Sequence, residues 1–169
     1  MKLWPLLMIA TGVVMSFVLT CITPFPAIAA FAARTVSRRA AIVTLMGALV
    51  GNQIAGYAFL GYPHMPVTYL WGPMMALACF AGLAAAWPVR NLVLAFAASF
   101  VAYELVIVAF SAATNTLADF ALPAFLAAVE ANLTGFAILA VLRAGLVGIE
   151  RLMQARSLAA LAHPWTPRH

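Results

Sequence analysis

Residues 92–113 read LVLAFAASFVAYELVIVAFSAA, and Glu104 is the only charged residue among them. A run of about 18 or more apolar residues is long enough to cross the hydrocarbon core of a bilayer as a helix. A soluble protein could also bury such a helix, but it would need many charged residues elsewhere to cover its surface. The rest of the sequence therefore decides between the two.

The whole chain shares the composition of this stretch. Of its 169 residues, 66% are hydrophobic and 8% are charged, whereas ordinary soluble domains have about 25% charged residues. The mean hydropathy is +1.06. Nine basic and four acidic residues are too few to cover a soluble fold of this size. The sequence predicts an all-α, polytopic membrane protein with about six transmembrane helices in one bundle.

Prolines, glycines and charges divide the chain into six apolar stretches. We expect helices over about residues 3–20, 27–35, 40–60, 67–87, 92–113 and 123–152. The segment Thr23-Pro24-Phe25-Pro26 ends the first stretch, because two prolines interrupt helical hydrogen bonding. The second stretch is short and spans only if it is tilted or if its arginines reach the interface. We expect a transmembrane domain over residues 1–152 and a cytosolic tail over residues 153–169.

The basic residues predict the orientation. With a cytosolic N-terminus, all nine lysines and arginines fall on the cytosolic side, and the three opposite loops carry none. Cytoplasmic loops of membrane proteins are enriched in Lys and Arg. The chain opens like a signal peptide, but the sequence after residue 20 is equally apolar, so we expect a retained first span. The sequence predicts a bacterial inner-membrane protein with both termini in the cytosol.

Three of the stretches place polar residues at a similar depth. Asn52 and Gln53 lie about 20 Å from the inner end of their stretch at 1.5 Å per residue. Glu104 lies about 21 Å from Arg90, and Glu130 about 10 Å from the outer end of the last stretch. In a core about 30 Å thick these heights coincide. The layer is either an interhelical hydrogen-bond network or a pocket open to the outside, whose carboxyl groups take a proton or bind a cation.

The outer loops add candidates above this layer. Tyr62 and His64 would close a pocket, and Asn115 would add a hydrogen bond. The predicted substrate-binding residues are Asn52, Gln53, Tyr62, His64, Glu104, Asn115 and Glu130. The aromatic residues that could face the pocket are Tyr57, Phe59, Tyr69, Trp71, Tyr103 and Phe110. Aromatic faces with a carboxylate suit a flat or cationic ligand.

Catalytic and metal chemistry find little support in the sequence. No histidine lies within an expected span, so a Ser–His pair or a His-based zinc site cannot form there. Cys21, His64 and Met65 offer soft ligands to a cobalt-centred molecule, but without metal-binding spacing. We therefore expect no enzyme, no resident metal, no permanently bound cofactor and no nucleic-acid partner.

Ala29 and Ala33 are four residues apart, a spacing that lets helix backbones approach closely. They either pack within the chain or dock a partner membrane subunit. With this spacing, the predicted topology and the outer polar layer, residues 1–152 resemble the substrate-binding S component of energy-coupling-factor vitamin transporters. In that family the alanine patch is expected on the first helix, whereas here the best candidate is on the second.

The resemblance implies capture of a vitamin from outside and docking on a transmembrane coupling subunit that works with cytosolic ATPases. It implies substrates such as thiamine, biotin, riboflavin or cobalamin. A thiamine-like cation would suit the carboxyl groups, and a corrinoid would suit Cys21 and His64. Two other functions stay open: an ion- or proton-coupled small carrier, and a structural subunit of a larger membrane complex.

Overall fold

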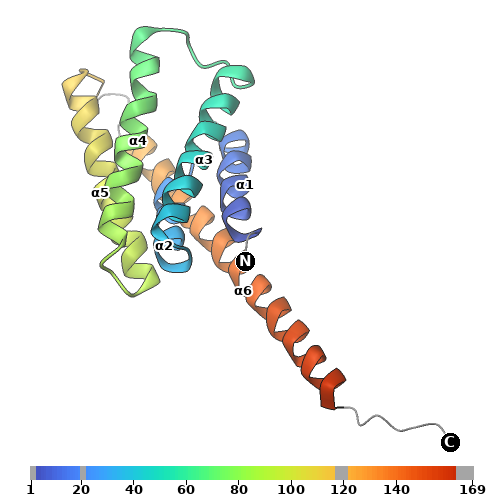
Figure 1. Ribbon diagram of the computed structural model, residues 1–169. Helices are drawn as coiled ribbons and strands as arrows, with labels where there is room; N and C mark the ends of the chain where they lie inside the picture. Colours follow the sequence, from blue (N-terminus) through green and yellow to red (C-terminus); the bar gives the residue numbers. More distant parts are fainter. Residues whose placement is uncertain (1–2, 20–21, 117–121, 163–169) are drawn as a thin grey trace, which may run out of the picture. The chain divides into compact units, whose positions relative to one another are not determined.

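The computed structural model describes residues 3–19, 22–116 and 122–162, and its regular elements are all helices (Figure 1). The helices are α1 (Leu3–Val18), α2 (Phe25–Thr35), α3 (Arg38–Ala58), α4 (Pro66–Ala86), α5 (Leu92–Ala113) and α6 (Leu122–Ala162). The all-α prediction is confirmed. The chain divides into two units at Leu139/Ala140. The first holds α1 to α5 and the beginning of α6; the second holds the rest of α6, which continues beyond its expected end at residue 152.

Four helices in the described part of the chain are long and apolar enough to cross a membrane: α3, α4, α5 and residues 122–155 of α6. Helix α1 is apolar but has only 16 residues. Helix α2 has 11 residues, which make a helix about 16 Å long, roughly half the thickness of a bilayer core. The six predicted helices are present, and four of them reach the length of a span.

The chain break before α2 follows from its prolines. Pro24 occupies the N-cap position of α2, and Pro26 lies in its first turn, where its missing N–H interrupts no helical hydrogen bond. Residues 25–32 are all buried. Four of these eight residues are alanines, whose small side chains let the neighbouring helices approach closely. Helix α2 is therefore a short helix enclosed within the first unit.

Small residues allow neighbouring helices of the first unit to pack closely. On α3, Gly47 and Gly51 face Ile9 and Val13 of α1, where a Cβ atom would leave too little room. This supports intramolecular packing for these glycines. Ala29 is 1% exposed, because neighbouring helices of the same chain cover it. The predicted docking residue Ala29 is therefore not available to a partner in this structure.

Ala33, the second residue of the predicted docking patch, also contacts residues of this same chain. It packs against a buried cluster of Ala30, Ala86 and Ala95, which belong to α2, α4 and α5. The alanine spacing indicated a close helix contact correctly, but that contact is internal.

The two ends of the first unit differ in chemistry. At one end, Arg34 of α2 donates a hydrogen bond to the carbonyl oxygen of Trp87, and the Arg38 guanidinium lies 5.3 Å from the Trp87 ring centre. These contacts join the α2–α3 turn to the α4–α5 turn. The α3–α4 connection lies at the opposite end (Figure 1). There Tyr57 stacks on Tyr69, with ring centres 5.4 Å apart.

Candidate functional site

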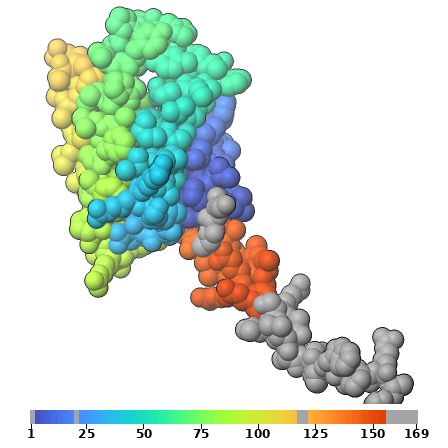
Figure 2. All heavy atoms as spheres, in the orientation of Figure 1, coloured from blue at the N-terminus to red at the C-terminus, as the bar shows by residue number. Residues whose placement is uncertain are grey.

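A cavity of about 410 Å³ lies in the first unit, beside the start of α2. Because α2 begins only after the break, residues Ile22 and Thr23 and the first residue of α2, Phe25, line the cavity where a longer helix would otherwise fill the space. Figure 2 shows an opening between the segments of α3 and α4 below their connection. The cavity thus follows directly from the shortness of α2.

The cavity lining is drawn from α2 to α6 and from two connections, and most of it is apolar. Its residues are Ile22, Thr23, Phe25, Gln53, Tyr62, Pro63, Thr68, Trp71, Met75, Tyr103, Glu104, Ile107, Val108, Ala124, Phe125, Ala128 and Asn132. Of these, one is acidic and none is basic. The lining matches the usual composition of small-molecule sites, which are apolar with a few placed polar groups.

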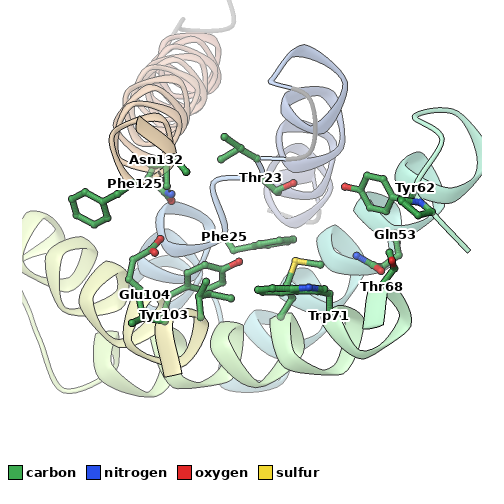
Figure 3. Close-up of a pocket in the computed structure, with 17 residues that line it drawn as sticks. Thr23, Phe25, Gln53, Tyr62, Thr68, Trp71, Tyr103, Glu104, Phe125 and Asn132 are labelled. Atoms are coloured by element: carbon green, nitrogen blue, oxygen red, sulfur yellow. Dashed lines mark hydrogen bonds between the residues drawn. The ribbon is translucent and has the colours of Figure 1, made fainter. Parts of the chain in front are cut away.

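The polar side chains of the cavity form two groups. Figure 3 shows Glu104 of α5 and Asn132 of α6 on one side. Gln53, Thr68 and Tyr62 lie on the opposite side, from α3, α4 and the loop between them. A ligand that spans the cavity would therefore meet polar groups at both ends.

Aromatic rings lie between these two groups. Phe25, Tyr103 and Trp71 present their rings along one wall of the cavity (Figure 3). The Phe25 and Tyr103 ring centres are 6.2 Å apart and tilted by 36°. Trp71 is held by an edge-to-face contact with Phe110, at 4.7 Å between ring centres. Such a wall is suited to a flat molecule, since ring faces stack on one another or attract a cation.

Glu104 is half-buried on α5. No arginine, lysine or histidine of the described residues pairs with its carboxyl group. A carboxylate at membrane depth is unfavourable unless it is paired or protonated. Glu104 lies in the cavity wall, which agrees with the depth expected for it along its helix.

Asn132 is 2% exposed and was not predicted as a site residue. Its side-chain nitrogen Nδ2 donates to the carbonyl oxygen of Ala128 at 2.9 Å. Its oxygen Oδ1 is buried and accepts no hydrogen bond from the described residues. Because the Ala128 carbonyl oxygen can only accept, the Asn132 amide must turn its nitrogen toward it. The Asn132 oxygen Oδ1 is then left as the acceptor without a donor.

Asn52 is fully buried but does not line the cavity. Its Nδ2 donates to Ser16 Oγ at 3.0 Å and to Thr23 Oγ1 at 2.8 Å. The two hydroxyl oxygens are themselves 2.7 Å apart and share a hydrogen bond. Asn52 thereby ties α3 to the end of α1 and to the break before α2. Its position is that of a structural residue behind the cavity wall.

Gln53 and Tyr62 both line the cavity, as predicted from their expected depth and loop position. Gln53 Nε2 donates to Asn52 Oδ1 at 3.0 Å, so the cavity wall is joined to the network behind it. The Tyr62 ring lies against Gly56, where any side chain would collide with it, and the Tyr62 N–H donates to the Gly56 carbonyl oxygen at 3.1 Å.

His64 is exposed and lies outside the cavity lining. Its Nδ1 is 2.8 Å from the Tyr69 hydroxyl oxygen, and its ring lies beside that of Tyr57. Tyr57 and Tyr69 are not lining residues either. Among the predicted pocket aromatics, Trp71 and Tyr103 are in the wall, and Phe59 is 71% exposed.

Two further predicted site residues lie outside the cavity lining. Asn115 is an exposed turn residue after α5, with a φ angle of 55° that asparagine tolerates well. Glu130 lies on the exposed face of α6. The expectation that Glu130 is buried beside Glu104 is wrong, because residues two apart on a helix point in nearly opposite directions, and Asn132 occupies the inward face.

Among the described residues, no group of three or more His, Cys, Asp or Glu side chains could hold a metal ion. Cys79 is a buried free thiol on α4. Cys21, considered with His64 as a possible soft ligand, lies outside the described residues. Comparison with protein-family models, with curated proteins and with solved structures finds no match for this chain.

The sequence reasoning missed several polar and aromatic lining residues, among them Phe25, Thr68, Phe125 and Asn132. Helix α6 does not separate its polar and apolar residues onto two faces, so its sequence pattern does not mark an inward face. Charge singled out Glu130 instead. The helical periodicity of α6 shows that Glu130 and Asn132 point in different directions. It does not show which of the two directions is inward, because that depends on the neighbouring helices.

Proposed function

We propose that this chain is a membrane-embedded subunit that captures a small, vitamin-like molecule for uptake. The observation that carries the proposal is the cavity of about 410 Å³ with its mainly apolar lining and two polar ends. Ligand-binding pockets commonly measure about 300–1,000 Å³ and have this composition. The chain itself need not act as an enzyme for this function.

The proposed orientation places the cavity toward the outside of a bacterial inner membrane. Arg34 and Arg38 lie at the end opposite to the α3–α4 connection, and arginine-rich ends favour the cytosol. Both termini are then cytosolic. In this arrangement α1 and α3 to α6 cross the bilayer, and α2 reaches about halfway. Irregular backbone at membrane depth is tolerated where it lines a cavity, as Thr23 does here.

The resemblance to S components of energy-coupling-factor vitamin transporters supports the same proposal. It implies a coupling membrane subunit and cytosolic ATPases as partners. Since Ala29 is buried, we place the docking surface on another face of the bundle. A cavity near the lower end of the usual range favours a vitamin of one or two rings over the far larger corrinoids.

The test is purification of the chain in mild detergent, followed by mass spectrometry of the small molecules it retains. We expect one bound compound, and we expect Ala128→Phe, which fills the cavity, to abolish retention. Leu133→Phe is the matched control, because Leu133 is 53% exposed on the same helix. Retention that is equal in both variants would contradict the cavity as the site.

Two other outcomes would replace the proposal. A pH-dependent ion flux in proteoliposomes that contain only this chain, with no retained compound, would identify a small carrier. An absence of both retained compound and flux, with stable association to another membrane subunit, would identify a structural subunit.

A further inference from the structure

Asn132 and Glu104 present hydrogen-bond acceptors to the same side of the cavity. Asn132 Oδ1 is buried and lacks a donor from the described residues. Figure 3 shows the Glu104 carboxyl group on that side too. No hydrogen bond joins the two side chains, and the lining contains no basic residue. When Glu104 is ionised, this end of the cavity presents acceptors that no hydrogen bond from the described residues fills.

An empty buried acceptor destabilises a protein unless something donates to it. Water can fill such a place only if it finds two or more polar partners in a roomy site. Here both residues line a cavity of about 410 Å³, so a ligand with suitable donors can take the place of water beside them. The group that satisfies both must carry N–H or O–H donors.

We infer that the Glu104–Asn132 end of the cavity recognises a flat organic cation that bears N–H groups, such as an amidinium, a guanidinium or a protonated amino-heterocycle. This inference rests on the proposed function, since it concerns the ligand of the same cavity. The cation neutralises the Glu104 carboxylate, one N–H donates to Asn132 Oδ1, and the attached ring lies along Phe25, Tyr103 and Trp71.

The same arrangement discriminates against other classes of ligand. An anionic group at this end would meet an unpaired carboxylate, and like charges in an apolar cavity repel strongly. A quaternary ammonium would pair with Glu104 but has no N–H for Asn132, which would stay unfilled. A neutral ring without donors would leave both acceptors empty. Asn132 thus determines specificity between cations that have N–H groups and cations that lack them.

The inference is tested with defined probes on the full chain in detergent. Benzamidinium is a flat cation with N–H groups. Trimethylanilinium is a cation without them, benzoate is an anion, and benzyl alcohol is a neutral ring with a single O–H donor. We expect benzamidinium to bind at least about tenfold more tightly than the other three, because hydrogen bonds to charged groups are the strong ones. Binding is measured from the rise of the thermal unfolding midpoint with increasing probe concentration, and by calorimetric titration.

Variants assign the effect to the two residues. Glu104→Gln should weaken benzamidinium binding about 10- to 100-fold. Glu130→Gln, the matched control on an exposed carboxyl group, should leave it unchanged. Asn132→Leu should weaken binding of benzamidinium but not of trimethylanilinium. Asn132→Asp keeps the acceptor and adds charge, so it should bind both cations at least as well as the natural chain.

The outcomes separate the inference from the proposed function. Equal binding of benzyl alcohol and benzamidinium, unaffected by Glu104→Gln, would overturn the inference while the cavity remained a binding site. An equal effect of sodium or potassium chloride would also overturn it. If no probe binds and the purified chain retains no compound, the proposed function fails as well. If Glu104→Gln does not fold, the comparison of Asn132→Leu with Asn132→Asp decides.

Discussion

Two asparagines of this protein are equally buried and differ in their surroundings. Asn52 on α3 is 0% exposed, and Asn132 on α6 is 2% exposed. The side chain of Asn52 is hydrogen-bonded through both its nitrogen and its oxygen, to Ser16, Thr23 and Gln53. That of Asn132 is hydrogen-bonded only through its nitrogen, and its oxygen has no donor among the described residues.

The two asparagines differ in how completely the protein itself fills their hydrogen-bonding groups. Burial alone does not separate the two asparagines, and neither does depth along their helices. Their hydrogen bonds do separate them. A complete network such as that of Asn52 stabilises the fold, whereas an incomplete one such as that of Asn132 leaves an acceptor that a ligand can fill. We call the first group, Asn52 with Ser16 and Thr23, the closed cluster, and Glu104 with Asn132 the open pair.

The largest expected effect comes from Gly135, which affects both groups. A side chain at Gly135 would collide with the ring of Pro24. Pro24 adjoins Thr23 of the closed cluster, and Gly135 lies one turn from Asn132. We expect Gly135→Val to lower the free energy of unfolding by about 3 kcal/mol, because a rigid proline ring cannot move aside without shifting backbone. The measurement is detergent-based unfolding followed by circular dichroism.

Gly145→Val is the matched control for that substitution. Gly145 lies on the same helix, and a Cβ atom added to it would meet no other atom within 4 Å. We expect the substitution to be neutral or slightly stabilising, since most residues favour a helix more than glycine does. Equal losses for the two variants would show that helix α6 responds to any added side chain, and not to contact with Pro24.

The next effect concerns the closed cluster. Asn52→Leu removes the donor to Ser16 and Thr23 and the acceptor of Gln53. We expect a loss of about 2 kcal/mol, because the remaining groups stay buried without their partner. The thermal unfolding midpoint of the ligand-free protein measures this. A midpoint equal to that of the natural chain would mean that water or a rearranged Gln53 replaces Asn52.

The open pair should respond in the opposite way. Asn132→Leu removes an unfilled acceptor and a hydrogen bond to a helix carbonyl, so we expect the ligand-free protein to be unchanged or stabilised by up to about 1 kcal/mol. The same unfolding measurement applies. If Asn132→Leu and Asn52→Leu destabilise the ligand-free protein equally, the distinction between the closed cluster and the open pair is wrong.

Much of the fold was predictable from local chemistry. The break at Pro24 and Pro26 and the expected helices follow from proline's missing N–H and from apolar length. Of the site, Gln53 and Glu104 were predicted from their depth along a helix, and Tyr62 from its position in a loop. Depth fixes height along a helix but not direction around it.

The direction of side chains around a helix could not be predicted from the sequence. On an apolar helix such as α6, nothing in the pattern chooses between Glu130 and Asn132, so charge was a misleading guide. In lipid, apolar residues suit both the packed and the exposed face, and the usual amphipathic signal is lost. The same reason explains Ala29, whose spacing indicated a close contact without saying whether a partner or the chain itself makes it.

The smallest expected effect concerns the exposed rings near the cavity. Tyr69→Phe removes the hydrogen bond between the Tyr69 hydroxyl and His64 Nδ1, which is exposed. We expect a stability change below about 0.5 kcal/mol, because water competes for an exposed hydrogen bond. Since neither residue lines the cavity, the affinity for benzamidinium should change by less than about twofold, or 0.4 kcal/mol. Calorimetric titration of the variant measures it, with Tyr57→Phe as the neighbouring control.

A loss of tenfold or more in Tyr69→Phe alone would show that His64 closes the site when a ligand is bound, as its loop position predicts. The open pair would then need a third member outside the cavity wall, and hydrogen-bond satisfaction in the ligand-free chain would no longer be enough to identify the residues that hold the ligand.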